Sequence, residues 1–211
     1  MTRIRMILVA MLCAAAAPAA AQEAVPRIPL FAVDVRATFP RFPSTQALAD
    51  SRGLNLNELP GLGIGVDVAA NIYFFRWRAM TIGIGGEAMT SVAHQSPQNA
   101  IYVPTTERFR TVDAQLSLNF GSANGWSYLS GGIGGSYWSL IPDGGAATPQ
   151  DDLARTTINF GGGARWFAKK HLALSVDGRF YALQDVPEPN GMYPASPKAT
   201  MFIFGVGIAV K

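Results

Sequence analysis

Short runs of alternating apolar and polar residues fill most of this chain. In the first run, Phe31, Val33 and Val35 face one side. Asp34 and Arg36 face the other. A period of two is typical of a β-strand with one apolar face. The pattern predicts eight strands, at residues 30–39, 62–72, 77–89, 108–120, 126–140, 156–167 and 172–183, and in a last run that reaches the C-terminus.

The links between the predicted strands alternate in length. Those at 41–60, 90–107, 141–155 and 184–198 are long, and those at 73–76, 121–125 and 168–171 are short. Long connections on one side, short turns on the other and an even strand number are typical of an outer-membrane β-barrel. We therefore predict an all-β fold: an eight-stranded antiparallel up-and-down transmembrane β-barrel. Its short turns and both termini are expected in the periplasm.

The main alternative is a soluble eight-stranded barrel such as a lipocalin. A solvent-facing sheet surface would carry lysine at many positions. Here Lys169, Lys170, Lys198 and Lys211 all lie in turns, in loops or at the last residue. The polar face of the strands instead carries Gly, Ser, Asn and a few Asp and Arg residues, which suits a barrel interior.

The N-terminus has the features of a secretory signal peptide. A short basic start is followed by an apolar run and by a small-residue pattern that ends at Ala21. We expect a signal peptide at 1–21, a periplasmic tail at 22–29 and one barrel domain at 30–211. The only cysteine, Cys13, lies in the signal, and Leu12 before it argues against lipidation.

Composition changes the picture in one respect. The 211 residues include 17 basic and 14 acidic side chains, a net charge of +3. Removal of Arg3 and Arg5 with the signal leaves 15 basic residues and a net charge of +1. A basic patch for nucleic acid is therefore not expected. Charged residues make up only 15% of the chain, against about 25% in ordinary soluble domains.

Charged residues also fall on the predicted inward face. Near mid-height these are Asp34, Arg36, Asp67, Asp113, Asp177 and Arg179. They could line a polar conduit, or they could form a salt-bridged plug, since an unpaired buried charge is costly. An eight-stranded barrel is only wide enough for side chains, which favours the plug. Paired inward glycines, such as Gly161 and Gly163, are expected to make room inside.

Aromatic residues gather near the predicted strand ends, as expected for the girdles of a membrane barrel. The periplasmic girdle is predicted to contain Tyr73, Trp77, Phe120, Trp126 and Trp166. Candidates for the outer girdle are Phe39, Phe109, Trp138, Phe180, Tyr181 and Phe202. Arg108 and Arg110 have outward parity at the outer end of their strand. They are either solvated or paired with lipopolysaccharide phosphates.

Two segments near the C-terminus carry a family resemblance. They are Gly161-Gly-Gly-Ala-Arg-Trp-Phe, continuing through Asp177-Gly-Arg-Phe-Tyr181, and the closing run Phe202–Val210. Together they resemble small outer-membrane β-barrel proteins of the OmpA/OmpX-like group. The resemblance implies an integral outer-membrane protein with a structural or surface-interactive role through its long loops. We expect a monomer that contacts outer-membrane lipid and lipopolysaccharide.

The chain departs from that group at its end. Such barrels usually end in Phe or Tyr, which the outer-membrane assembly machinery reads. This chain ends in Val210-Lys211 instead, which bears on the efficiency of insertion.

Some barrels of this kind modify lipid A, and a deacylase of the group uses a His-x-Ser-Asn run. Here His94-Gln95-Ser96-Pro97 follows Glu87, but it is expected in a loop, and Pro97 replaces Asn. We therefore expect no enzyme, with a lipid A-modifying activity and a narrow pore as the alternatives. His94 and His171 are too far apart in sequence to form a metal motif, and no cofactor is predicted.

Overall fold

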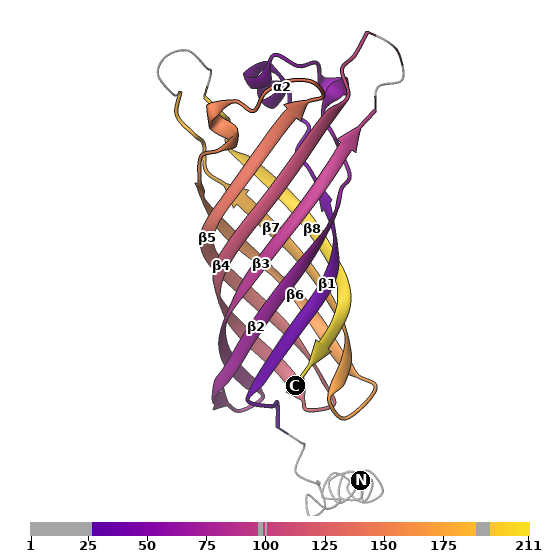
Figure 1. The fold of residues 1–211 in the computed structure, drawn as a ribbon. Coiled ribbons are helices and arrows are strands. Elements are labelled where there is room, and N and C mark those ends of the chain that lie inside the picture. Colours follow the sequence, from indigo (N-terminus) through magenta and orange to yellow (C-terminus); the bar gives the residue numbers. More distant parts are fainter. Residues whose placement is uncertain (1–26, 97–98, 100, 189–194) are drawn as a thin grey trace, which may run out of the picture.

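Eight antiparallel strands close into one barrel in the order β1 to β8, and β8 pairs with β1 (Figure 1). The strands are β1 (Phe31–Arg41), β2 (Ile64–Trp77), β3 (Met80–Gln95), β4 (Thr105–Ser122), β5 (Gly125–Pro142), β6 (Arg155–Phe167), β7 (Leu172–Leu183) and β8 (Ala199–Val210). The closed eight-stranded up-and-down fold predicted from the sequence is confirmed.

This computed structural model describes residues 27–96, 99, 101–188 and 195–211. The predicted signal peptide at 1–21 and residues 22–26 of the predicted tail lie outside that part of the chain. Of the helices in the described part, none is both long and apolar enough to cross a bilayer.

The long loops gather at one end of the barrel, opposite the short turns and the C-terminus (Figure 1). The first loop folds over this end with helix α2 (Gln46–Arg52) and the 3-10 helix η2 (Leu56–Glu58). The Thr45 hydroxyl caps α2 by accepting from the backbone N–H of Leu48 at 3.3 Å, and the helix ends at Gly53 with φ of 64°. A second 3-10 helix, η3 (Pro149–Asp151), lies between β5 and β6.

The first short turn is displaced from its predicted position. β2 continues through residues 73–76 to Trp77, and the turn lies at Arg78 and Ala79. The pairing of β2 with β3 shifts between Tyr73 and Phe75, which marks a β-bulge. The bulge adds one residue, so the strict alternation on which the prediction relied ends there.

Strands β3, β4 and β5 are also longer than predicted at the long-loop end. The second long link is therefore only residues 96–104, because β3 runs to Gln95 and β4 begins at Thr105. At 18 residues, β4 and β5 are much longer than the roughly 9–11 residues that cross a bilayer. The hairpin that they form therefore projects beyond an apolar band of membrane thickness.

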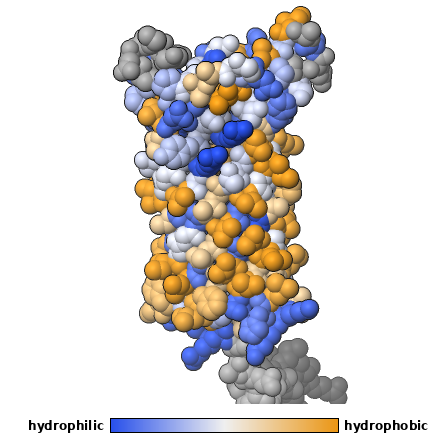
Figure 2. Space-filling view, viewed as in Figure 1, coloured by the Kyte–Doolittle hydropathy of each residue, from blue (hydrophilic) through white to orange (hydrophobic). Residues whose placement is uncertain are grey.

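The outward face of the barrel is apolar around its middle (Figure 2). Outward residues such as Ile84, Val112 and Leu116 are at least half exposed. The described lysines lie in turns, in loops or at the last residue, as the sequence predicts. Around the middle of the barrel, apolar side chains thus face outwards and charged side chains such as Asp34, Arg36 and Asp67 face the barrel axis.

Candidate functional site in the barrel interior

Arg36 of β1 is the centre of a charged network that crosses the barrel interior. Its guanidinium binds Asp67 of β2 with two hydrogen bonds, Nε to Oδ2 at 2.9 Å and Nη2 to Oδ1 at 3.0 Å. Nη2 also donates to Glu87 of β3 at 3.3 Å, and Nη1 donates to the Tyr128 hydroxyl of β5 at 3.0 Å. A single arginine therefore joins four strands across the lumen.

Arg179 of β7, which is separated from β1 only by β8, completes the network. It lies within 3.3 Å of both Asp177 oxygens and donates to Asn159 at 2.7 Å and Ser130 at 2.8 Å. The Tyr128 hydroxyl donates to Asp177 at 2.7 Å. Tyr128 thereby connects the Arg36 group to the Arg179 group.

Glu87 links the same two groups. Its carboxylate accepts from Gln115 at 3.0 Å and from the Tyr181 hydroxyl. The Arg179 Nε lies 3.8 Å from its Oε2, and Arg36 Nη2 lies 3.3 Å from the same oxygen. Because both arginines contact Glu87, the Arg36 and Arg179 groups are linked by two side chains, Tyr128 and Glu87.

A second ion pair lies closer to the short-turn end. Arg165 of β6 binds Asp34 of β1 through Nε at 2.9 Å and Nη2 at 2.6 Å, and the Ser175 hydroxyl donates to Asp34 at 2.7 Å. The guanidinium also lies over the Tyr128 ring, 4.4 Å from its centroid, and 5.5 Å from that of Trp126. Both charges are therefore paired, as burial requires.

The six candidate interior residues are all buried, but they do not form one group. Asp113 lies opposite Glu87 in the pairing of β3 with β4 but has no ion pair within the described residues, and its Oδ2 accepts from Thr111 at 2.7 Å. The sequence places Glu87 and Arg165 on the inward face but outside the candidate set. It gives no sign of the hydroxyl of Tyr128, which links the two arginine groups.

The predicted periplasmic girdle is wrong at two positions. Trp77, Phe120 and Trp166 point outwards and are exposed, but Tyr73 and Trp126 are only 5% and 3% exposed and point inwards. Trp126 packs edge-on against Tyr73 at 5.8 Å and stacks on Phe167 at 5.1 Å. Tyr73 and Trp126 each lie at an inward position of their strand. The alternation along the strand, and not closeness to a turn, therefore decides which way the side chain points.

An apolar layer fills the interior above the charged network. It contains Phe109, Trp138 and Tyr181, which were predicted as candidates for the outer girdle but are at most 1% exposed. Leu48 of α2 and Phe42 pack against the same layer from the first long loop. At this end of the barrel, side chains from both the strands and the loop therefore pack into one apolar cluster.

Two polar contacts fix the first loop over this layer. Arg52 at the end of α2 pairs with Asp151 of η3 at 3.2 Å. Burial lowers the pKa of the Arg52 guanidinium, and Asp151 partly offsets the shift. Glu58 accepts from the backbone N–H groups of Asn55 at 2.6 Å and Val103 at 2.7 Å, which lowers the pKa of its carboxyl.

The space left in the charged layer is very small. A cavity of about 10 Å³ remains among residues that include Arg36, Tyr128 and Arg179, which is room for about one water molecule. Inward glycines provide the space that these side chains occupy. A Cβ added at Gly163 would lie 2.6 Å from the Tyr128 hydroxyl and 2.1 Å from the Val176 carbonyl oxygen.

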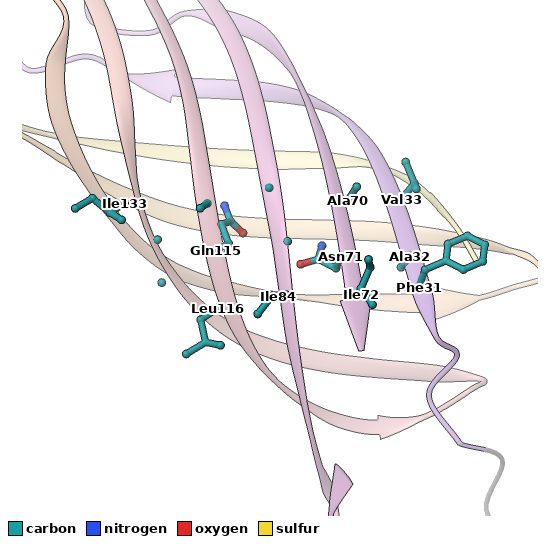
Figure 3. Close-up of a pocket in the computed structure, with 15 residues that line it drawn as sticks. Phe31, Ala32, Val33, Ala70, Asn71, Ile72, Ile84, Gln115, Leu116 and Ile133 are labelled. Atoms are coloured by element: carbon teal, nitrogen blue, oxygen red, sulfur yellow. The ribbon is translucent and has the colours of Figure 1, made fainter. Parts of the chain in front are cut away.

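The wider hollows lie outside the lumen. One, of about 720 Å³, runs along the outward face over small residues such as Ala70, Gly86 and Ala114. Figure 3 shows Ile72, Ile84 and Leu116 around it. It is a shallow apolar groove of the kind that lipid chains fill. In the described part of the chain, no group of three or more potential metal ligands comes together.

The predicted loop position of the His94 motif is also wrong. His94 and Gln95 belong to β3, and His94 points outwards with its Nδ1 3.1 Å from the Thr106 hydroxyl. Glu87 faces the interior and is bound to Arg36, so strand parity keeps it on the opposite face from His94. Pro97 lies outside the described residues. The histidine and the carboxylate therefore do not meet.

No family model matches this chain, and no curated protein does. Among solved structures, it is similar to Neisserial surface protein A (NspA), with 12% identity, a TM-score of 0.54, and coverage of 87% of this chain and 97% of that chain. The fold is that of the small outer-membrane β-barrels.

Two further similarities are weaker. Ail, the attachment invasion locus protein of Yersinia pestis, is 10% identical, with 85% of this chain and 97% of that chain covered and a TM-score of 0.48. The outer membrane protease OmpT from Escherichia coli is 8% identical, with 85% and 96% covered and a TM-score of 0.41. At such identities the likeness concerns the fold and carries no activity over to this chain.

Proposed function

We propose that this chain is an integral protein of the bacterial outer membrane, a monomeric barrel with a closed lumen. The apolar outward face supports the membrane placement, because exposed side chains such as Ile84 and Leu116 suit lipid contact. A closed barrel also pairs its backbone groups internally, as lipid requires. The predicted signal peptide agrees with export.

The membrane placement is tested by extraction and electrophoresis. The folded protein should require detergent and should migrate differently on a gel before and after heating. A chain that stays in solution without detergent, with no heat-dependent shift, would overturn the placement.

The cross-lumen contacts of Arg36 and Arg179 support the closed lumen. The apolar layer around Trp138 supports it as well, because its side chains fill the interior above these contacts. The proposed role is therefore structural or surface-interactive rather than conductive. Vesicles that carry the protein should swell in small sugars no faster than empty vesicles, and rapid swelling would favour the narrow pore.

Contacts between described parts of the first three long loops support a surface-interactive role. Arg52–Asp151 joins the first loop to the third, and Glu58 joins the first to the second through the Val103 N–H. Contacts between loops reduce the entropy lost when a partner binds. This end of the barrel is the proposed site of contact with the exterior.

Lipopolysaccharide is the proposed lipid partner at the outer rim. Arg108 and Arg110 are exposed on the outward face of β4, beside a hollow of about 230 Å³ that Tyr137 and Ser139 also line. Paired guanidiniums suit phosphate groups. Arg108→Gln with Arg110→Gln should lower the lipopolysaccharide that co-purifies with the barrel, whereas Lys169→Gln with Lys170→Gln should not. Equal retention by both variants would contradict this role.

We propose no catalytic function for the His94 segment, because Glu87 lies on the other face of the strand. Expression of the wild-type chain should leave lipid A acylation unchanged. A change in acylation that Ser96→Ala abolishes would favour the enzyme.

A further inference from the structure

The two ends of the barrel differ in charge. The long-loop end carries both signs, for example Asp143 and Asp152 beside Arg108 and Arg110. At the short-turn end, all the charged side chains in the described part of the chain are cationic. They are Arg27, Arg76, Arg78, Lys169, Lys170 and Lys211. The nearest described carboxylate side chain, Asp34, faces the interior and is paired with Arg165. Hydrophilic side chains form a band below the apolar zone (Figure 2).

A hollow of about 650 Å³ lies within this cationic end. One part of its lining is apolar and includes Pro29, Phe31 and Phe167. Another part is basic and includes Lys169 and Lys170 of the β6–β7 turn. The hollow thus offers an apolar wall and a cationic wall to the same ligand.

The C-terminal residue fixes one side of the hollow. The Lys211 ammonium lies over the Phe167 ring, 3.7 Å from the centroid, and donates to the Ala123 carbonyl. The His171 Nδ1 lies 3.1 Å from the Lys211 carbonyl oxygen. These contacts join the last residue to the β6–β7 turn and to the β4–β5 turn, so the wall is defined before any ligand arrives.

Lys169 and Lys170 are the available charges at this site. Both are exposed, and neither has an ion pair or a side-chain hydrogen bond within the described residues. Adjacent lysines in a four-residue turn repel each other, so an anion placed between them would relieve a local excess of positive charge. The pair is therefore available to a ligand, whereas Lys211 is already engaged.

The position of the hollow along the barrel axis restricts which kind of ligand can fill it. Phe31 and Trp166 are about half exposed on the outward face next to it, which places the edge of the apolar band there. A molecule that fills the hollow therefore needs an apolar part on the barrel wall and an anionic part at the turn. Anionic glycerophospholipids of the periplasmic leaflet combine these two parts.

We propose that the short-turn end binds an anionic glycerophospholipid, with its phosphate at Lys169 and Lys170 and an acyl chain along Phe31. This inference rests on the proposed membrane placement. Each Lys or Arg near an anionic surface contributes about fivefold in affinity, so the pair should give a preference of at least several-fold over a zwitterionic lipid. The preference should weaken as salt is raised.

The test uses the full barrel in phosphatidylcholine vesicles. Tryptophan fluorescence is titrated with brominated phosphatidylglycerol and, separately, with brominated phosphatidylcholine, because exposed Trp166 and Trp77 lie at this end. The ratio of the two quenching constants gives the lipid preference. Wild-type protein should prefer phosphatidylglycerol several-fold, and Lys169→Gln with Lys170→Gln should bring the ratio close to one.

The matched control is Arg41→Gln with Lys198→Gln, which removes the same charge from the opposite end, away from Arg108 and Arg110, and should keep the preference. An inserted barrel with no preference, or an unchanged ratio in the lysine variant, would overturn this inference alone. An equal loss in the control would mean that only net charge matters, which also overturns it. A chain that shows no heat-dependent gel shift and is not quenched by either lipid would overturn the membrane placement as well.

Discussion

At the scale of single residues, the charged network depends on two arginines that bind Asp67, Glu87 and Asp177. Arg36 and Arg179 share Glu87, and each also binds an aspartate. Because these groups are buried, removing one arginine leaves carboxylates without a counter-ion in a site that water barely reaches. The cost of such a deletion is much larger than the net contribution of the intact pair.

Arg36→Met should therefore lower the free energy of unfolding by about 3–5 kcal/mol. Denaturant unfolding of the barrel in detergent measures the change. Adding Asp67→Asn should recover part of the loss. Arg41→Met, at an exposed position of the same strand with no ion pair to the described residues, should have almost no effect. An equal loss at both positions would contradict the role of the network.

Glu58 makes the docking of the first loop dependent on pH. Its carboxylate accepts two backbone N–H groups, which lowers the pKa of the folded form below the ordinary value of about 4.5. Because this pKa is lowered, the Glu58 carboxylate stabilises the docked loop at pH values above about 4.5. This stabilisation is lost as the pH falls through the pKa of the folded form.

We therefore expect hydrogen-exchange protection of the Val103 amide to decrease between about pH 6 and pH 3, after correction for intrinsic exchange. Glu58→Gln should show lower protection at neutral pH and little further change with acid. Protection that stays constant down to acid pH in the wild type would contradict this account.

At the scale of elements, the sequence predicts the strands well because alternation is a local property. The prediction fails where a bulge interrupts the alternation or where closeness to a turn is weighed against it. The bulge at Phe74 breaks the alternation of β2 and moves the turn to Arg78. Closeness to a turn suggested that Trp126 belongs to the girdle, although its own parity already placed it inside. Parity applied to every aromatic residue would have found the interior rings.

Some contacts could not be predicted from parity at all. Tyr128 bonds to Arg36 of a strand that is 92 positions away in the sequence. Such a contact depends on the shear of the closed barrel and on which rotamers fit across it. The inward glycines are the one feature of the sequence that indicates this packing, because a large side chain on the neighbouring strand needs the space that they leave.

Gly163→Ala tests that packing. The added methyl group would press on the Tyr128 hydroxyl and the Val176 carbonyl, so we expect a loss of about 1–3 kcal/mol in unfolding free energy. The control is Gly135→Ala in β5, where a Cβ meets no atom within 4 Å. If the two substitutions cost the same, the loss would reflect glycine chemistry in strands rather than crowding in the lumen.

At the scale of the whole molecule, the barrel is filled in successive layers and has chemically different ends. Arg165 and Asp34, the Arg36–Glu87–Arg179 group and the apolar layer around Trp138 follow one another along the axis. The first loop then packs on the last layer through Leu48. Each layer narrows the lumen, and together they are the basis for the proposal that the barrel does not conduct.

Single-channel recording in planar lipid bilayers tests this closure most directly. Vesicles that carry the wild-type barrel and a known channel former should be fused with the bilayer, so that every fusion event is registered. After each event, a closed lumen should give no current steps beyond those of the channel former. Reproducible discrete steps that require the wild-type barrel would contradict a closed lumen.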